Sequence, residues 1–102
     1  MKTLGTHNYY IYILTNKGRS VLYIGVTNDL NHRIRFHKEN ANLNKKAFTS
    51  KYKCFNLIYY EHFNDINIAI AREKQIKGWT RVKKETLIEG FNSKWKFLNN
   101  EI

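Results

Sequence analysis

Glu73 is the residue whose position most directly suggests chemistry. A helix is expected over residues 66–79, and on its apolar stripe Glu73 falls between Ala69 and Ile76. An isolated buried charge is costly, so such a carboxylate must be paired, bound to a metal or placed at the rim of a cavity. Two interpretations are open: an internal ion pair with a Lys or Arg, or a Mg²⁺ site completed by water and a phosphate.

Two tyrosines, Tyr12 and Tyr23, form the second candidate group. In a hairpin that is symmetric about Lys17-Gly18 they are direct cross-strand partners on one face of the sheet. Tyrosine is also a common strand former, so the pairing alone does not establish a site. Side chains alternate along a strand, so the opposite face is expected to be aliphatic and to consist of Ile11, Ile13, Leu22, Ile24 and Val26.

Arg33 and His37 form the third group. They lie four residues apart on a helix expected over residues 30–39, beside the inward-facing pair Leu30 and Ile34. They should therefore project together from one edge of the core, near the end of the second strand. Taken alone, the pair is more typical of a solvated arginine and of a histidine favoured by the dipole at a helix C-terminus.

A small set of elements would position these residues. Strands are expected at residues 9–14, 21–26 and 55–63, which are rich in aromatic and β-branched side chains. Residues 27–29 and 64–65 can cap the two helices named above, and a short third helix at 81–88 is expected to end at Gly90. The polar and basic residues 40–53 are expected to form a loop. The order ββαβαα indicates an α+β fold, a small sheet with helices packed on it, in a single domain over residues 1–102.

Positive charge is the strongest compositional signal. Eighteen Lys and Arg against eight Asp and Glu give a net charge of +10 on 102 residues. Such an excess indicates a polyanionic partner, and nucleic acid is favoured over a membrane because no apolar run approaches the ~20 residues of a membrane span. Basic residues outside the three groups are expected to contact phosphates without sequence preference, namely Lys38, Lys45, Lys46, Lys51, Arg81, Lys83 and Lys84.

Cysteine and histidine usage narrows the chemistry. The one cysteine, Cys54, allows no intramolecular disulfide and is expected to be a small buried hydrophobe. His7, His32 and His62 lack the spacing of zinc ligands, so no zinc site is expected. The first residues are too polar and too few for a signal peptide, and we expect a cytoplasmic protein.

Together, these positions resemble the GIY-YIG nuclease family. The two motifs that name the family correspond to Tyr10-Ile11-Tyr12 and Tyr23-Ile24-Gly25. The family's helix arginine, its following histidine and its metal-binding glutamate fall on Arg33, His37 and Glu73. The resemblance covers nearly the whole chain. The chain most resembles the small stand-alone members of the family, which are related to the N-terminal nuclease domain of the excision-repair incision subunit.

Two positions fit the family pattern less closely. Tyr10 stands where the family name has glycine, a change that bears on substrate access near this strand. A late asparagine of the family aligns loosely with Asn92. The resemblance further implies a three-stranded antiparallel sheet flanked by helices, which agrees with the element order read from the sequence.

The resemblance implies a divalent-metal-dependent endonuclease that hydrolyses DNA phosphodiester bonds, in repair or DNA processing. Mg²⁺ or Mn²⁺ on Glu73 would stabilise the departing 3′ oxygen, and Arg33 would bind phosphate oxygens. Tyr12 and Tyr23 would hold the attacking water or the phosphate. We expect Tyr12 to be the general base with His37 assisting, although a tyrosine pKa of about 10 keeps His37 itself open as the base. The alternative is a non-catalytic module that keeps the fold and binds nucleic acid; oligomeric state is not predicted.

Overall fold

A three-stranded antiparallel sheet lies at the centre of the fold. The computed structural model describes residues 8–39 and 48–102. The strand order is β2-β1-β3, so β1 pairs on both sides. The strands are β1 (Tyr9–Thr15), β2 (Leu22–Thr27) and β3 (Asn56–Phe63). The helices are α1 (Leu30–Glu39), α2 (Phe48–Tyr52), α3 (Ile66–Lys77) and α4 (Arg81–Phe91), followed by the 3₁₀ turn η2 (Asn99–Glu101).

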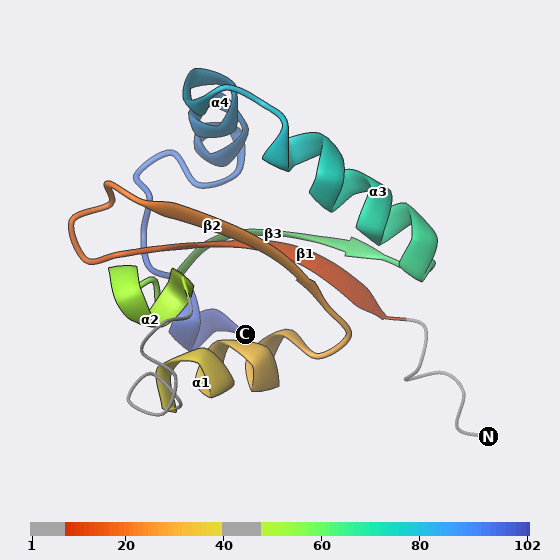
Figure 1. Ribbon diagram of the computed structural model, residues 1–102, viewed down its shortest axis with the longest axis horizontal. Coiled ribbons are helices and arrows are strands. Elements are labelled where there is room, and N and C mark those ends of the chain that lie inside the picture. The colour runs from red at the N-terminus through yellow and green to blue at the C-terminus, as the bar shows by residue number, and fades with distance from the viewer. Residues whose placement is uncertain (1–7, 40–47) are drawn as a thin grey trace.

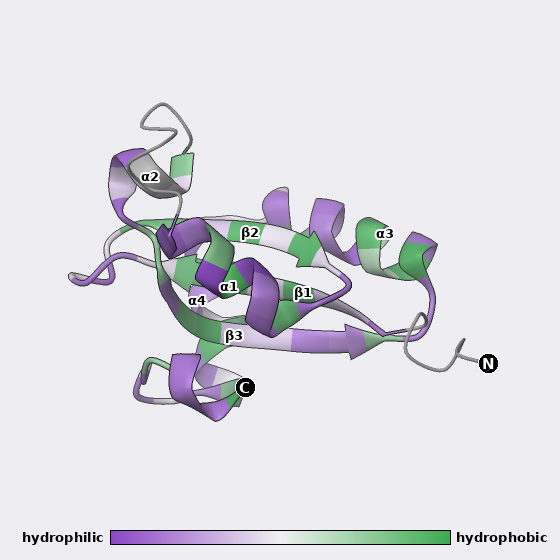
Figure 2. Ribbon diagram, turned by 90° about the horizontal axis from the view of Figure 1, so that it is seen from below, coloured by the Kyte–Doolittle hydropathy of each residue, from purple (hydrophilic) through white to green (hydrophobic). Residues whose placement is uncertain are grey.

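The helices divide between the two faces of the sheet. Helices α3 and α4 lie on one face, while α1, α2 and the C-terminal turn lie on the other (Figure 1). Seen from the α1 side, α1 lies across the strands with α2 near one end of it (Figure 2). The predicted α+β fold, a small antiparallel sheet flanked by helices, is confirmed.

The hairpin has a different register from the predicted one. Tyr12 pairs with Gly25, and Tyr23 pairs with Leu14. The cause lies in the turn, where the Asn16 side chain accepts hydrogen bonds from the Ser20 and Val21 amides at 2.8 and 3.1 Å. The offset from the predicted pairing is two residues, an even number, so every side chain keeps its predicted face.

Two hydrophobic clusters result, one on each face. The aliphatic face is confirmed: its buried cluster, packed beneath α3 and α4, comprises Ile11, Ile13, Ile24, Ile58, Tyr59, Ile76 and Ile88. The tyrosine face is also core, because α1 covers it. Its buried residues are Tyr12, Leu14, Leu30, Ile34, Cys54, Leu57 and Leu98. Cys54 is buried as expected, and burial raises its thiol pKa to about 11, which keeps the sulfur protonated.

Aspartate side chains cap the first turns of α1 and α3 as predicted. Asp29 accepts a hydrogen bond from the His32 amide at 3.1 Å, and Asp65 accepts one from the Asn67 amide at 2.7 Å. These bonds satisfy amides of the first turn that have no partner inside the helix. Within the described part of the chain, no helix is both long enough and apolar enough to span a bilayer.

The predicted loop and the predicted end of the last helix are wrong in part. Residues Phe48–Tyr52 of the expected loop form α2, which ends where Lys53 adopts a positive φ of 55°. Residues 40–47, with the candidate cations Lys45 and Lys46, lie outside the described residues. The last helix continues through Gly90 to Phe91, because Gly90 keeps a negative φ there and Asn92 provides the C-cap.

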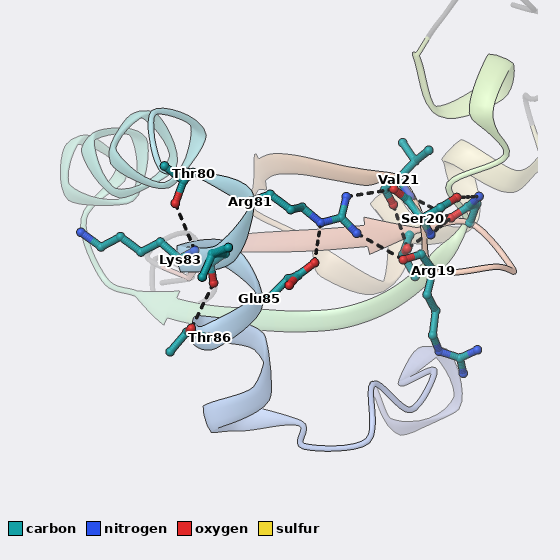
Figure 3. Close-up of polar contacts among 11 residues, drawn as sticks. Arg19, Ser20, Val21, Thr80, Arg81, Lys83, Glu85 and Thr86 are labelled. Atoms are coloured by element: carbon teal, nitrogen blue, oxygen red, sulfur yellow. Dashed lines mark hydrogen bonds and ion pairs between the residues drawn. The ribbon is translucent and has the colours of Figure 1, made fainter.

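Arg81 ties the start of α4 to the β1–β2 turn. Its guanidinium donates to the carbonyls of Ser20 at 2.9 Å and Arg19 at 3.3 Å, and to the Glu85 carboxylate at 2.9 Å (Figure 3). The turn is held from its other side as well, because Arg19 donates to the Trp95 carbonyl at 3.1 Å. Arg81 therefore fixes the hairpin that carries Tyr12 and Tyr23.

Replacement of Arg81 by Gln is expected to lower the free energy of unfolding by about 1–2 kcal/mol, since two carbonyl bonds from a charged donor are lost. Lys83 is the matched control, because its side chain projects away from the turn (Figure 3). Lys83→Gln should change stability by no more than about 0.5 kcal/mol. Urea unfolding measures the free energy of unfolding of both variants, and an equal decrease in the two would contradict the role given to Arg81.

Candidate active site

Tyr12 lies at the centre of the candidate site. Its side chain, on the middle strand β1, is only 2% exposed. Its hydroxyl lies 3.1 Å from His37 Nε2, and its ring centroid lies 6.2 Å from that of Tyr23. Burial raises the pKa of Tyr12 above its usual range, Tyr23 raises it further, and the charge of Arg33 lowers it. The phenol is therefore neutral at physiological pH and needs a proton acceptor to react.

Gly25 provides the space that Tyr12 occupies. It is the cross-strand partner of Tyr12, and a Cβ atom on Gly25 would lie 2.5 Å from the Tyr12 hydroxyl oxygen. Neither group can move aside easily, because the Tyr12 ring is buried and Gly25 belongs to the backbone of the paired strand β2. The glycine of the second motif is therefore required by the close approach of this ring.

Gly25→Ala is expected to destabilise the fold by about 1–3 kcal/mol and to move the Tyr12 hydroxyl away from His37. Gly18→Ala is the control, because a Cβ atom there meets nothing within 4 Å. Thermal unfolding, together with the imidazole NMR signals of His37, measures both effects. If Gly25→Ala matched Gly18→Ala in both, the close approach would not matter.

His37 is held between two elements. Nε2 faces the Tyr12 hydroxyl, and Nδ1 lies 3.1 Å from the hydroxyl oxygen of Thr49, a buried residue of α2. Burial lowers the pKa of His37, and the nearby charge of Arg33 lowers it further. The imidazole is therefore neutral near pH 7 and can take a proton from Tyr12. Sequence reasoning missed Thr49 because it falls in the expected loop and belongs to no motif.

Arg33 and Tyr23 lie at the border of this buried group. Arg33 is exposed on α1, and its guanidinium carbon lies 5.7 Å from the Phe36 ring. Its charge lowers the pKa of both Tyr12 and His37. Tyr23, on β2, has its ring 5.6 Å from that of His37. Arg33 therefore adds positive charge to the side of the sheet on which Tyr12, Tyr23 and His37 lie together.

Glu73 lies on α3, which packs on the face of the sheet opposite α1. Its side chain is 16% exposed and makes a 3.0 Å ion pair with Lys77, whose side chain is 52% exposed. Its charge also raises the pKa of Tyr12. The adjacent Arg72 is not its partner, because Arg72 binds Glu61 through two 3.0 Å bonds. The predicted ion pair is therefore present, although it forms at the rim and not in a sealed core.

The Lys77 pair leaves Glu73 available for a metal. A pair four residues apart on a helix, with its lysine half exposed, contributes only about 0.3–0.5 kcal/mol, so a divalent cation would compete with the ammonium at little cost. Among the described residues, no group of three or more His, Cys, Asp or Glu side chains is arranged to hold a metal. A metal at Glu73 would therefore have one protein carboxylate as its ligand, and Mg²⁺ suits such a site because that ion keeps several waters and binds phosphate oxygens.

The candidate phosphate-binding cations lie on two sides of the molecule. Lys38 on α1 and Lys51 on α2 belong to the side that carries His37, whereas Lys83 and Lys84 belong to α4 on the other. Lys51 lies 5.4 Å from the Tyr52 ring, and Lys83 lies 4.5 Å from the Trp79 ring. As phosphate contacts, all four remain predictions. So does Arg81, whose guanidinium is already engaged by the turn.

Asn92 has a structural role that accounts for its burial. Its amide nitrogen donates to the carbonyls of Ile58 and Lys96 at 3.0 and 2.8 Å, and its oxygen accepts from the Lys96 amide at 3.0 Å. These bonds hold the C-terminus of α4 against β3. The described bonds of Asn92 thus do not include Tyr12, Tyr23, Arg33, His37 or Glu73.

Comparison with known proteins agrees with the fold and the motifs. The GIY-YIG catalytic domain matches residues 8–86, so the chain belongs to the GIY-YIG family of nucleases. It is 39% identical over 84 residues to a UPF0213 protein of Bacillus pumilus, covering 81% of both chains. It is 36% identical over 93 residues to a UPF0213 protein of Clostridium perfringens, covering 91% of this chain and 96% of the relative.

A solved structure is also similar. The solution NMR structure of a UPF0213 protein from Bacillus halodurans superposes with a TM-score of 0.50 at 34% sequence identity. The similarity covers 80% of this chain and 83% of that one. The names of these relatives state no activity, so the similarity supports the family and the fold.

Proposed function

We propose that the protein is a divalent-metal-dependent endonuclease that hydrolyses DNA phosphodiester bonds in DNA repair or processing. The observation that carries this proposal is the contact between two titratable side chains of the family motifs, the buried Tyr12 hydroxyl of β1 and the His37 imidazole of α1, 3.1 Å apart. The charges of Arg33 on α1 and Glu73 on α3 act on the pKa of the same phenol. A structural role alone does not require an imidazole at a buried tyrosine whose pKa is shifted by a cation and an anion.

The proton in the proposed reaction moves from water through Tyr12 to His37. A neutral imidazole 3.1 Å from the phenol can accept the Tyr12 proton as Tyr12 takes one from the attacking water. Thr49 orients the ring, and Arg33 binds the non-bridging phosphate oxygens and stabilises the developing charge. Mg²⁺ or Mn²⁺, held by Glu73, would supply Lewis-acid stabilisation of the departing 3′ oxygen. This arrangement uses Tyr12 and His37 as one acid–base unit.

Protonation of His37 should set the acid limb of activity. Its pKa is lowered by burial and then by Arg33, so the unfolded chain takes up a proton at higher pH than the folded chain does. The contribution of His37 to the free energy of unfolding is therefore complete above a pH of about 6.5, and it is lost as the pH falls towards the pKa of His37 in the folded chain. Arg33→Gln should raise the His37 pKa, as an NMR titration would show. A His37 pKa above 6.5 in the wild type would contradict this account.

Nicking of supercoiled plasmid tests the proposed reaction. With Mg²⁺ or Mn²⁺ we expect open circles that DNA ligase reseals, because cleavage that releases the 3′ oxygen leaves a 3′ hydroxyl and a 5′ phosphate. A chelator should stop the reaction. Metal-independent nicking, or ends that cannot be resealed, would contradict the proposal. The ion pair of Glu73 with Lys77 favours one alternative, a binding module, which would retain DNA without nicking it.

A further inference from the structure

We propose that α2 is a base-stacking site, in which Phe48 and Tyr52 hold an unpaired nucleobase of a single DNA strand beside the phosphate at Tyr23. This inference rests on the proposed function, because it places the scissile phosphate among Tyr12, Tyr23 and Arg33. It adds the substrate class: DNA that is single-stranded, or unpaired, next to the cleaved bond.

A continuous series of rings runs from the buried phenol to the surface. The centroids of Tyr12 and Tyr23 are 6.2 Å apart, those of Tyr23 and Phe48 are 5.8 Å apart, and those of Phe48 and Tyr52 are 4.7 Å apart. Tyr12 is 2% exposed, whereas Phe48 and Tyr52 are 44% and 42% exposed. The last two rings therefore offer aromatic surface to solvent at the border of the candidate site.

The local geometry of α2 accounts for this exposure. Thr49 faces inward, where it is buried against His37. Phe48 and Tyr52 lie four residues apart, which places them on one face of the helix, and that face points outward. Thr49 thus anchors the helix to the site, while two large rings stay in contact with water. Exposed neighbouring aromatic rings beside a functional site are typical of a binding surface.

The charges around the rings fit a nucleic acid strand. The Lys51 ammonium lies 5.4 Å from the Tyr52 ring, and Arg33 is exposed on the neighbouring helix α1. The chain as a whole carries +10. Single strands are bound by this combination, in which cations contact the backbone and aromatic rings stack on bases. Bases in a duplex already stack on their neighbours, so an exposed ring pair selects a strand whose bases are unpaired.

The test is binding without metal, measured by fluorescence anisotropy with a labelled single strand and a duplex of the same sequence. We expect the single variants Tyr52→Leu and Phe48→Leu each to weaken single-strand binding by about five- to a hundredfold. Duplex binding should change less than about twofold. Tyr52→Phe, which keeps the ring, should restore affinity. Phe91→Leu is the control, since Phe91 is similarly exposed but is the last residue of α4, the helix on the other side of the sheet.

An abasic nucleotide scanned along the single strand locates the contact. At one position the abasic site should weaken wild-type binding as much as Tyr52→Leu does, and should add nothing in the variant. Equal losses on single strand and duplex, or an equal effect of Phe91→Leu, would overturn the proposal. Because no cleavage is measured, a wild type that shows this pattern but never nicks DNA would contradict the endonuclease and leave the stacking site standing.

Discussion

Replacement of Glu73 by Gln is expected to lower metal-dependent nicking by at least about a thousandfold, since a bound metal supplies several kcal/mol of charge stabilisation. The amide keeps the size of the side chain but binds a divalent cation far more weakly. Stability should change by no more than about 0.5 kcal/mol, because the only described ion pair of Glu73 is with the half-exposed Lys77. Single-turnover nicking and urea unfolding measure the two quantities.

Lys77→Gln separates the metal role from the ion pair. It removes the same 3.0 Å contact while leaving the Glu73 carboxylate in place. If Glu73 holds a metal, this variant keeps activity and needs less Mg²⁺ for half-maximal rate, because no ammonium competes for the carboxylate. If Glu73 is only a structural partner of Lys77, the two variants should behave alike. Equal nicking rates in both would remove the metal site from the account.

Tyr12→Phe is expected to lower the nicking rate by about a hundred- to ten-thousandfold, the range typical of lost acid–base catalysis. The ring still fills its place in the core, so the fold should remain. The loss comes from the missing hydroxyl, which lies 3.1 Å from His37 Nε2 and would relay the proton of the attacking water. The pH–rate profile of the residual activity should also lose its dependence on His37.

Tyr59→Phe is a matched control for Tyr12→Phe. Tyr59 is also a buried tyrosine, but it belongs to the cluster beneath α3 and α4, where its hydroxyl donates to Glu61. Loss of that bond should affect stability and leave nicking per folded molecule unchanged. If both substitutions lowered the rate equally, the effect of Tyr12→Phe would be attributable to general disturbance of the sheet. DNA binding should stay the same in both.

Local patterns were sufficient to predict most of the fold. Runs of aromatic and β-branched residues located the strands, and aspartates placed before apolar stripes located α1 and α3 correctly, with Asp29 and Asp65 as caps. The register was wrong because it depends on the turn. There Asn16 binds two amides and Arg19 adopts a positive φ of 59°, and neither follows from the Lys17-Gly18 pair.

Tertiary contacts explain the other differences. Helix α2 is too short to be specified by its own propensity and is held by the burial of Thr49. Gly90 has the residue type of a helix end, yet the helix passes through it to Asn92, which binds backbone of β3. The sequence predicted that Tyr12 and Tyr23 share a face of the sheet but not what covers that face, where α1 packs and Tyr12 is buried.

The candidate site was predictable where residue type and spacing carry the information. His37 meets Tyr12 because helical spacing places it on the stripe beside the core, and Arg33, four residues earlier on α1, acts on the pKa of the same phenol. The sequence could not show that Lys77 is the partner of Glu73, because many lysines compete for that role. It also could not show that Thr49 contacts His37, since the two residues belong to different helices and no periodic sequence pattern relates them.

The most direct test of the central claim is the single-turnover rate of plasmid nicking by the wild type and by Glu73→Gln, at equal fractions of bound DNA. We expect nicking that requires Mg²⁺ or Mn²⁺, stops with a chelator, and is at least about a thousandfold slower in the variant. A wild type that binds the plasmid as tightly but nicks it no faster than Glu73→Gln, with either metal, would contradict the assignment of this site as a metal-dependent endonuclease.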